Sequence, residues 1–288
     1  MYALQLTAIR VVFFLIRCLP VRACGALGAG LGRVFYRIDK KHQKTSLDNL
    51  TLIYPEKEAN WHAHIARESF AELGRTLFEL PHVFLRSRSF LLSRVTIKGE
   101  AAFREAMAQQ KGVFLMASHH SNWELGGLMI SLLNYDSSII HSPLRQPALE
   151  AFLSACRCRF GAQLHARKEG LRWMPKALRQ GRCAAIMIDQ HQVNGMSVPF
   201  LGQDAMTTTL PAAFVYKYGT PIYSVILHRH AHEFRFCLEF KEIDAPPEGD
   251  DKALSAHALM SNVNAYFSKE IYARPELWLW SHRRWRDV

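Results

Sequence analysis

The sequence lacks the long, uninterrupted apolar run that a membrane-spanning helix needs. Such a helix takes about 20 consecutive apolar residues, but "VVFFLI" at positions 11–16 lies between Arg10 and Arg17, and no small-residue cleavage site of a signal peptide follows it. We therefore expect residues 1–38 to form a helical anchor in the plane of a membrane, with arginines among lipid phosphates. The alternative is that this segment is a core helix of a soluble domain.

Several motifs of common enzyme classes are also missing. The chain has no G-x-S-x-G after a predicted strand, no P-loop and no G-x-G-x-x-G after a strand, so serine hydrolases and nucleotide-binding enzymes of those types are excluded. It has six cysteines without a C-x-x-C pair, which indicates reduced thiols facing the cytosol. Internal repeats and low-complexity tracts are absent as well.

Acidic residues are few compared with basic ones. The 288 residues include 36 Lys and Arg against 25 Asp and Glu, a formal net charge of +11, and 49% are hydrophobic. This composition supports a buried core and an anionic partner such as a membrane surface, a phosphorylated substrate or an acidic protein. Basic and aromatic residues are not interleaved as in common RNA-binding modules, so we expect no nucleic acid partner.

The hydrophobic pattern of the chain changes near Gly99. Before it, the pattern is helical, with one helix at 42–57 ending near Pro55 and another at 60–80 ended by Pro81. After it, short apolar runs alternate with amphipathic stretches. The predicted strands are 112–117, 137–141, 162–166, 183–189, 221–228 and 233–240, and the predicted helices are 123–134, 147–160, 170–180, 209–218 and 253–270.

This alternation predicts the α/β class: a mostly parallel sheet with an antiparallel edge, flanked by helices and preceded by the helical anchor. We expect residues 39–288 to form that α/β domain. In such sheets ligands bind at the carboxyl ends of the strands, where His119 and Asp189 fall.

The stretch "VFLMASHHSNWELGG" at 113–127 is the strongest candidate for chemistry. Of the three histidines that have an acid five positions later, only His119, with Glu124, follows a buried strand and opens a helix. A carboxylate bonded to one imidazole nitrogen leaves the other nitrogen as a general base. We therefore predict that His119 is the base and that Glu124 orients it.

Two other interpretations of this stretch stay open. Ser121 and Glu124 also match a capping box at a helix start. A metal could be held by His119, His120 and Glu124, or by His228, His230 and His232, but neither set has a recognised zinc spacing. The latter three histidines fit a half-exposed face of an edge strand better.

Basic residues and a long loop supply further candidates. Arg167 follows a predicted strand, where its guanidinium could bind a phosphate, and Arg157, which precedes that strand, is its predicted companion. The loop at 189–214 is too long for a simple connector and is predicted to form part of a site. Its candidate residues are Asp189, which could also be a simple turn residue, and the apolar Pro199, Phe200 and Gly202.

Several segments in order, "HHSNWELGG", "RFGAQLHARKEG", "GRCAAIMIDQ" and "VPFLGQDAMTTT", resemble the lipid A biosynthesis (lauroyl/myristoyl) acyltransferase family, which belongs to the H-x4-D/E lysophospholipid acyltransferases. The resemblance runs nearly end to end and includes "DNLTLIYPE", Glu79 of "TLFEL" and the closing "PELWLWSHRRW". One departure is Ser142-Pro143, where many members have Arg-Pro; Arg145 is near enough in sequence to substitute.

The resemblance implies a membrane-bound enzyme on the cytoplasmic face of the bacterial inner membrane, active in lipopolysaccharide biosynthesis. It would move a fatty acyl group from acyl carrier protein to a hydroxyl of a lipid A precursor, or of a related phosphorylated or glycosylated lipid, without a cofactor or metal. His119 and Glu124 would be catalytic, Arg167 would assist the oxyanion or the acceptor phosphate, and Asp189-Gln190 would match a second strand-end motif. The alternative is a lipid-binding or membrane-scaffold protein with an inactive site.

Overall fold

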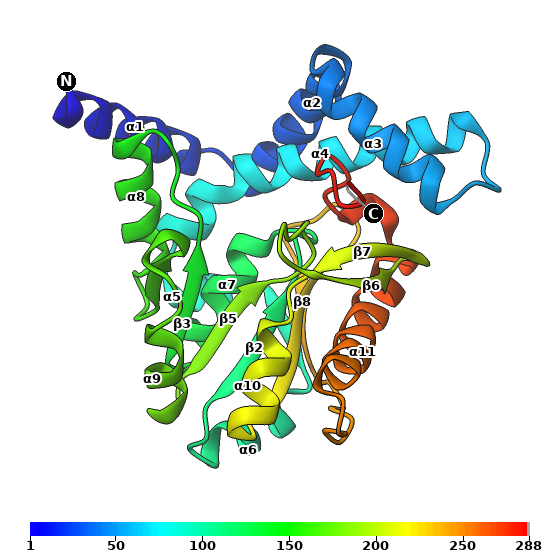
Figure 1. Cartoon of the computed structure of the whole chain (residues 1–288). Coiled ribbons are helices and arrows are strands. Elements are labelled where there is room, and N and C mark those ends of the chain that lie inside the picture. Colours follow the sequence, from blue (N-terminus) through cyan, green and yellow to red (C-terminus); the bar gives the residue numbers. More distant parts are fainter. Residues whose placement is uncertain (287–288) are drawn as a thin grey trace.

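The computed structural model describes residues 1–286 and folds them around a seven-stranded sheet with helices on its two faces (Figure 1). The strands are β1 (Val95–Lys98), β2 (Val113–Ala117), β3 (Ser137–His141), β4 (Gln163–Ala166), β5 (Cys183–Met187), β6 (Met196–Phe200), β7 (Gln203–Thr207), β8 (Ile222–Arg229) and β9 (Phe236–Glu242). The α-helices are α1 (Tyr2–Cys18), α2 (Val21–Ile38), α3 (Lys40–Ile53), α4 (Ala59–Leu85), α5 (Arg88–Leu92), α6 (Glu100–Ala108), α7 (Trp123–Leu132), α8 (Pro147–Arg157), α9 (Trp173–Arg179), α10 (Leu210–Tyr218) and α11 (Lys252–Ala273).

The sheet confirms the predicted α/β class. Its strand order is β1-β9-β8-β2-β5-β3-β4, and the strands from β8 to β4 are all parallel. The predicted antiparallel edge is confirmed: β9 runs antiparallel to β8, and the outermost strand β1 pairs with β9 in parallel. β1 and α6 were not among the predicted elements. At four residues, β1 carries too little of the period-2 pattern to be recognised.

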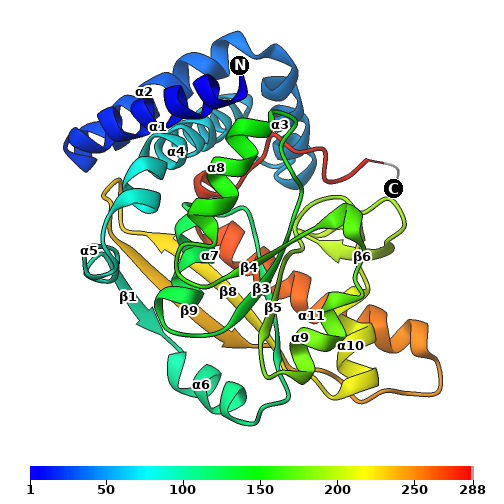
Figure 2. The same ribbon diagram turned by 90° about the vertical axis from the view of Figure 1, so that its left-hand side faces the viewer.

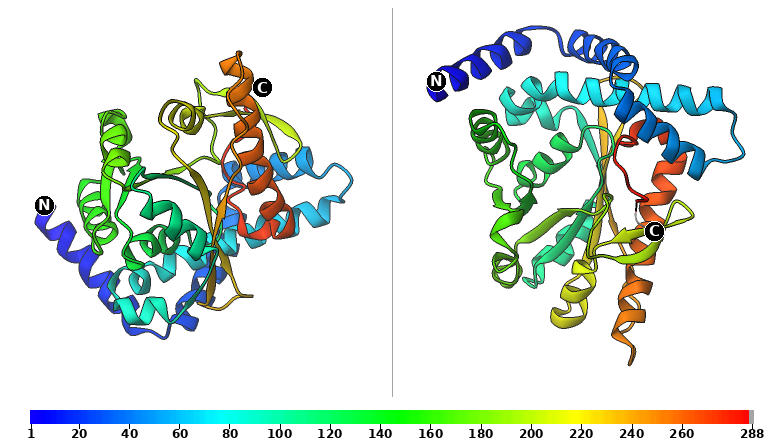
Figure 3. Two further views of the ribbon diagram at one scale, coloured as in Figure 1. Left: turned by 90° about the horizontal axis from the view of Figure 1, so that it is seen from below. Right: turned by 45° about the horizontal axis from the view of Figure 1, so that its top comes forward.

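Helices cover the two faces of the sheet in separate layers (Figure 2, Figure 3). Alternate residues of the buried strand β2 point to opposite faces: Phe114 and Met116 join the core that contains α9, α10 and α11, whereas Val113 and Leu115 join the core that contains α6, α7 and α8. A strand buried on both faces reads as a continuous apolar run, which explains why β2 was recognisable in the sequence.

Helix α4 lies across the carboxyl ends of the strands and contributes to the cores of the two layers (Figure 1). Pro81 does not end this helix as expected, since α4 continues to Leu85. A proline removes one backbone donor and so costs helix stability, but Val83 and Phe84 beyond it are completely buried. Their burial favours continuing the helix past the proline.

Three glycines allow α2 to cross α4 at backbone contact distance. A β-carbon at Gly28 would lie 2.3 Å from the carbonyl oxygen of Gly74, and one at Gly32 would lie 2.1 Å from the carbonyl oxygen of Phe70. Only glycine fits such an approach. The two glycines four positions apart in the N-terminal segment therefore form a helix-packing surface.

The N-terminal helices α1 and α2 lie on the same side of the sheet as its carboxyl ends (Figure 1). α1 rests on α8, where the rings of Phe13 and Phe152 are 4.7 Å apart, and it leaves Val11, Phe14 and Leu15 about half exposed. Within residues 1–286 no single helix is long and apolar enough to cross a membrane. α1 and α2 reach that length and composition only together, and they meet at a bend of 114°.

The long loop predicted at 189–214 contains a β-hairpin. β6 and β7 pair in antiparallel register around Leu201 and Gly202, with φ angles of 50° and 77°. Two consecutive positive φ angles are typical of a type I′ turn. The alternation of "MSVPF" and "QDAMT" is short, and the turn lacks the common Asn-Gly pair, so the local signal for this hairpin was weak.

Candidate active site

The candidate site lies where two neighbouring parallel strands end. β2 and β5 pair so that Ala117 is opposite Met187. His119 follows the first strand by two residues and Asp189 follows the second by two residues. Because these strands run in the same direction, their carboxyl ends meet at one edge of the sheet. The topology thereby brings together two side chains that are 70 positions apart in the sequence.

Asp189 holds His119 by its ring and by its backbone. The Nδ1 atom of His119 is 2.9 Å from Asp189 Oδ1, and the backbone N–H of His119 donates to Asp189 Oδ2 at 2.7 Å. Trp278 Nε1 also donates to Oδ2, at 2.8 Å. Since Asp189 is an acceptor, His119 carries its proton on Nδ1 and leaves Nε2 with a free lone pair.

The surroundings of this pair favour the charged form of each side chain, a carboxylate at Asp189 and an imidazolium at His119. Burial alone would lower the pKa of His119, but the charge and hydrogen bond of Asp189, with a smaller effect of Glu124, raise it above its ordinary value. Burial alone would raise the pKa of Asp189, but the charge and hydrogen bonds of His119, with a hydrogen bond from Trp278, lower it. Asp189 therefore stays ionised and stabilises an imidazolium at His119.

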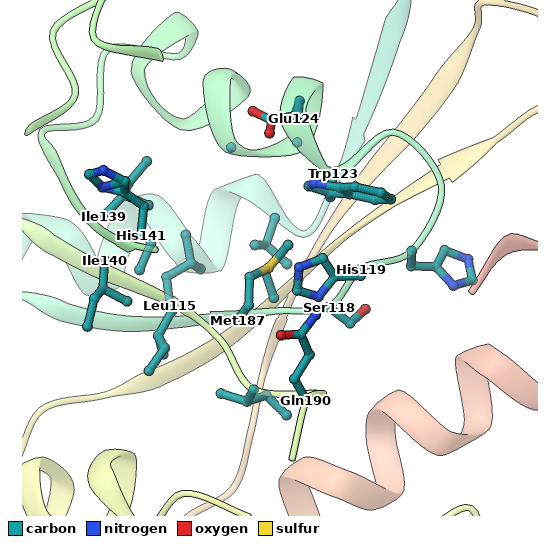
Figure 4. Close-up of a pocket in the computed structure, with 18 of the residues that line it drawn as sticks. Leu115, Ser118, His119, Trp123, Glu124, Ile139, Ile140, His141, Met187 and Gln190 are labelled. Atoms are coloured by element: carbon teal, nitrogen blue, oxygen red, sulfur yellow. The ribbon is translucent and has the colours of Figure 1, made fainter. Parts of the chain in front are cut away.

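The predicted hydrogen bond between His119 and Glu124 is wrong. Glu124 instead forms a two-pronged ion pair with Arg157 of α8, with distances of 2.9 Å from Nε to Oε2 and 2.5 Å from Nη2 to Oε1. The first turn of α7 directs Glu124 toward α8, whereas Asp189 reaches His119 from the adjacent strand end. Figure 4 shows Glu124 and His119 well apart, with the Trp123 ring between them in this view. A catalytic role for Glu124 stays a prediction.

The alternative interpretation of this stretch, a capping box formed by Ser121 and Glu124, does not hold either. Asn122, not Ser121, is the N-cap of α7, and its Oδ1 accepts a hydrogen bond from the backbone of Leu125 at 3.1 Å. Ser121 precedes the cap with a φ of 52°, a left-handed conformation that is uncommon for serine. Because Glu124 pairs with Arg157, it does not return to the helix start.

An apolar pocket of about 380 Å³ opens beside His119 (Figure 4). Its walls are mainly aliphatic, and they include Leu115, Ala117, Leu128, Ile139, Ile186 and Met187. Gly127 lines it with open space where a β-carbon would be. Polar side chains also line this pocket, and they include Glu124, His141, Arg157, Arg167, Gln190 and Gln192. The pocket can hold an apolar chain beside polar groups.

Several predicted site residues lie at this pocket. Arg167 is exposed, and its Nη2 donates to Gln192 Oε1 at 3.1 Å. Gln190 is exposed and lines the pocket, as does Ser142 at the position where many family members have arginine. Arg145 is exposed but does not line the pocket. The structure therefore leaves Arg167 as the arginine best placed to reach a bound anion there.

The other residues predicted to form a substrate-binding loop lie elsewhere. Asp189 is 1% exposed and acts on His119 instead of lining the pocket. Phe200 is 1% exposed and packs against Trp278, and the carbonyl of Pro199 accepts a hydrogen bond from Asn264 of α11. Gly202 is in the β6–β7 turn. The hairpin buries its apolar face on α11, so Pro199, Phe200 and Gly202 do not form a lip of the pocket.

Trp278 holds the carboxylate of Asp189, a role that the sequence pattern does not indicate. Its segment is fixed by Asn49 of α3, whose Nδ2 donates to the carbonyls of Trp280 and His282 at 2.8 Å each. The Nε2 atom of His282 in turn accepts from the backbone of His191 at 3.1 Å. The available signal was the closing "PELWLWSHRRW", whose contacts could not be read from its order alone.

The histidines considered as metal ligands do not form a metal site among residues 1–286. Among residues 1–286, no group of three His, Cys, Asp or Glu side chains could hold a metal ion. β8 ends at Arg229, so only His228 of its set lies on the strand, and His230 and His232 are exposed beyond it. His120 is 1% exposed beside His228, with its pKa lowered to about 3, chiefly by burial.

The chain is similar in sequence to known acyltransferases of lipid A biosynthesis. The chain is 25% identical over 278 residues to the lipid A biosynthesis lauroyltransferase of Escherichia coli K12, covering 96% of this chain and 89% of the relative. It is 24% identical over 272 residues to the palmitoleoyltransferase of the same organism, covering 93% and 86%, and 24% identical over 263 residues to its myristoyltransferase, covering 88% and 77%. The sequence model of the bacterial lipid A biosynthesis acyltransferases matches residues 2–287, and the chain belongs to this family.

Proposed function

We propose that this protein transfers a fatty acyl group from acyl carrier protein to a hydroxyl of a lipid A precursor or of a related phosphorylated or glycosylated lipid. The observation that carries the proposal is the pairing of His119 Nδ1 with Asp189 at the side of an apolar pocket. Membership of the acyltransferase family supports acyl transfer as the reaction.

The reaction follows from the free Nε2 atom of His119. This nitrogen takes the proton of the acceptor hydroxyl while its oxygen attacks the thioester carbonyl, and Asp189 stabilises the imidazolium that forms. The tetrahedral intermediate then collapses, the C–S bond breaks and a C–O ester bond remains. His119 returns the proton to the departing thiolate, so that the enzyme is restored.

The aliphatic pocket is the proposed site of the acyl chain. Gly126 and Gly127 line it without side chains, and a β-carbon at Gly126 would lie 3.6 Å from Leu227 Cβ, at van der Waals contact. A larger residue at either position would reduce the space for hydrocarbon. We therefore assign the acyl chain, not the sugar of the acceptor, to this part of the pocket.

We assign Arg167 to the oxyanion or to the acceptor phosphate. Its side chain donates a hydrogen bond to the neutral Gln192, so an anion would not have to displace a carboxylate there. Arg157 differs, because Glu124 already occupies two of its donors. It would contact an anion only after that ion pair opened.

The donor and the membrane are proposed from charge and exposed surface. The net charge of +11 suits an acidic carrier protein and an anionic lipid surface. Exposed apolar residues of α1 and α2, together with Arg10 and Arg22, fit insertion into the cytoplasmic face of the bacterial inner membrane. Removal of residues 1–38 should release the protein from membranes, as measured by sedimentation, whereas high salt alone should not.

The test is to incubate the purified protein with acyl-carrier thioesters and candidate lipids and to weigh the products by mass spectrometry. Wild type should add the mass of one acyl group to a lipid A precursor, and His119→Ala should abolish this gain. His120→Ala is the control and should lose much less. A wild type that binds these lipids without acylating any of them would instead support a lipid-binding or membrane-scaffold protein.

A further inference from the structure

A cluster of four buried charged residues lies beside the segment that carries His119. It consists of Glu72, Arg75 and Glu79 of α4 and Arg229 at the end of β8, and we call it the ion cluster. Their side chains are at most 6% exposed, and their formal charges balance. The proposed reaction uses none of them.

Arg229 is the centre of the ion cluster. Its Nη1 and Nη2 atoms each donate to one oxygen of Glu79 at 2.8 Å, and its Nε donates to Glu72 Oε1 at 2.6 Å. Arg75 approaches the other oxygen of Glu72 at 3.4 Å. Planar guanidinium donors hold carboxylates in a fixed orientation, so the ion cluster is a rigid unit.

The ion cluster is attached to the active-site segment through Asn122. The Nδ2 atom of this fully buried residue donates to Glu79 Oε2 at 2.9 Å. Its Oδ1 caps α7 through Leu125. One side chain thus connects α4 to the start of α7, three residues after His119.

The backbone between His119 and Asn122 depends on further contacts with α4 and the C-terminus. Ser121 has a φ of 52°, and its carbonyl accepts from Thr76 Oγ1 at 3.2 Å while its N–H donates to the carbonyl of Leu277 at 2.8 Å. A left-handed serine persists only where its surroundings hold it. Attachments on its two sides therefore set the direction in which His119 leaves β2.

Stability alone is a weak reason for such a cluster. Replacing a complete buried ion pair by apolar residues of similar volume is often neutral or stabilising, whereas removing one partner is costly. An ion cluster that supplies a fixed acceptor to the N-cap of α7 provides something that apolar residues cannot, namely an orientation.

We propose that Asn122, Glu79 and Arg229 are positioning residues that hold the 118–122 segment so that His119 stays aligned with Asp189. This inference rests on the proposed acyl transfer, because it names what keeps the base of that reaction in place. These residues touch neither reacting atom and act through His119.

The first test is Asn122→Ser. Serine is also a good N-cap, so α7 keeps its cap while the donor to Glu79 is lost. We expect kcat to fall on the order of 10-fold to 100-fold, because small misplacements of a catalytic group can cost that much, with KM unchanged within about twofold. Asp251→Ser, at the N-cap of α11, is the matched control and should keep wild-type kcat. A wild-type kcat in Asn122→Ser would overturn the proposal.

The second test separates positioning from stability. Glu79→Leu should lower Tm because it leaves Arg229 without its two-pronged partner. Adding Arg229→Met removes the whole pair and should bring Tm back toward wild type, but kcat should stay low because Asn122 still lacks its acceptor. If kcat recovered together with Tm, the ion cluster would be merely structural.

A third measurement does not depend on turnover. The Nδ1 proton of His119 can be followed by proton NMR of the ¹⁵N-histidine-labelled protein, with His119→Ala to assign it. In Asn122→Ser this resonance should move or broaden, since the hydrogen bond to Asp189 loses its alignment; an unchanged resonance would contradict the positioning role. A wild type without transferase activity would refute the proposed function while leaving this measurement interpretable.

Discussion

The two carboxylates around His119 occupy opposite kinds of environment. Asp189 is buried beneath the strand ends and accepts three hydrogen bonds, two from His119 and one from Trp278. Glu124 lies on the other side, at the pocket, where its partner is an arginine. A carboxylate with fixed donors can orient an imidazole, whereas one neutralised by a guanidinium acts on it mainly through long-range charge. The partner of the base is therefore the carboxylate that the sheet brings close, and not the one that is near in the sequence.

Asp189→Asn should have the largest effect on this comparison. The amide keeps the shape but loses the charge that stabilises the imidazolium, so the maximal rate should fall by about 100-fold to 10,000-fold. The neutral imidazole is the active form, and Asp189 raises its pKa. Activity in wild type should therefore decline as pH falls through a pKa above the ordinary histidine value, and this acid limb should move to lower pH in the variant. A pH–rate profile checks the shift, and an unmoved limb would argue against the pair.

Glu124→Gln should have a smaller effect than Asp189→Asn. It leaves Arg157 with an uncompensated positive charge near the base, so we expect a loss on the order of 10-fold in kcat/KM. Adding Arg157→Gln should restore part of this loss, since the double variant has no unpaired charge. If Glu124→Gln were as severe as Asp189→Asn and the second substitution gave no rescue, Glu124 would act directly in the reaction.

Arg167→Lys should have a modest effect, because it keeps the charge at the pocket and removes the planar fork. We expect transfer to fall several-fold while Tm stays unchanged, since the Arg167 side chain is exposed. Steady-state assays with a phosphorylated acceptor measure the loss. A rate equal to wild type would place Arg167 among ordinary solvated surface residues.

Chelation should have the smallest effect, namely none, because the two carboxylates act on an imidazole and not on a metal in the proposed reaction. Dialysis of the purified enzyme against EDTA, followed by the mass spectrometric assay, measures this directly. Loss of activity that returned with an added divalent cation would require a different role for Glu124 and Asp189.

Much of the fold could be predicted because its signals are local. The apolar run of β2, the amphipathic stretch that became α8 and the glycine pair in α2 each act within a few residues, where side-chain period and backbone sterics decide the outcome. The elements that escaped prediction are β1, α5, α6 and the β6–β7 hairpin, and the strands among them are short and carry weak patterns. At Pro81 a strong local signal gave a wrong prediction, because burial of the neighbouring residues outweighed the helix-breaking effect of the proline.

Three features can be recognised from the order of residues alone: a histidine follows a buried strand, the chain is basic, and its motifs are those of an acyltransferase family. Three contacts follow only from the folded chain: Asp189 is the carboxylate that meets His119, Trp278 holds this carboxylate, and Asn122 donates to Glu79. These contacts join residues that are between 43 and 89 positions apart. The periodicity of side chains carries information only about a single helix or strand. Contacts between distant residues depend on the order and register of the strands and on the crossing of α4 above them.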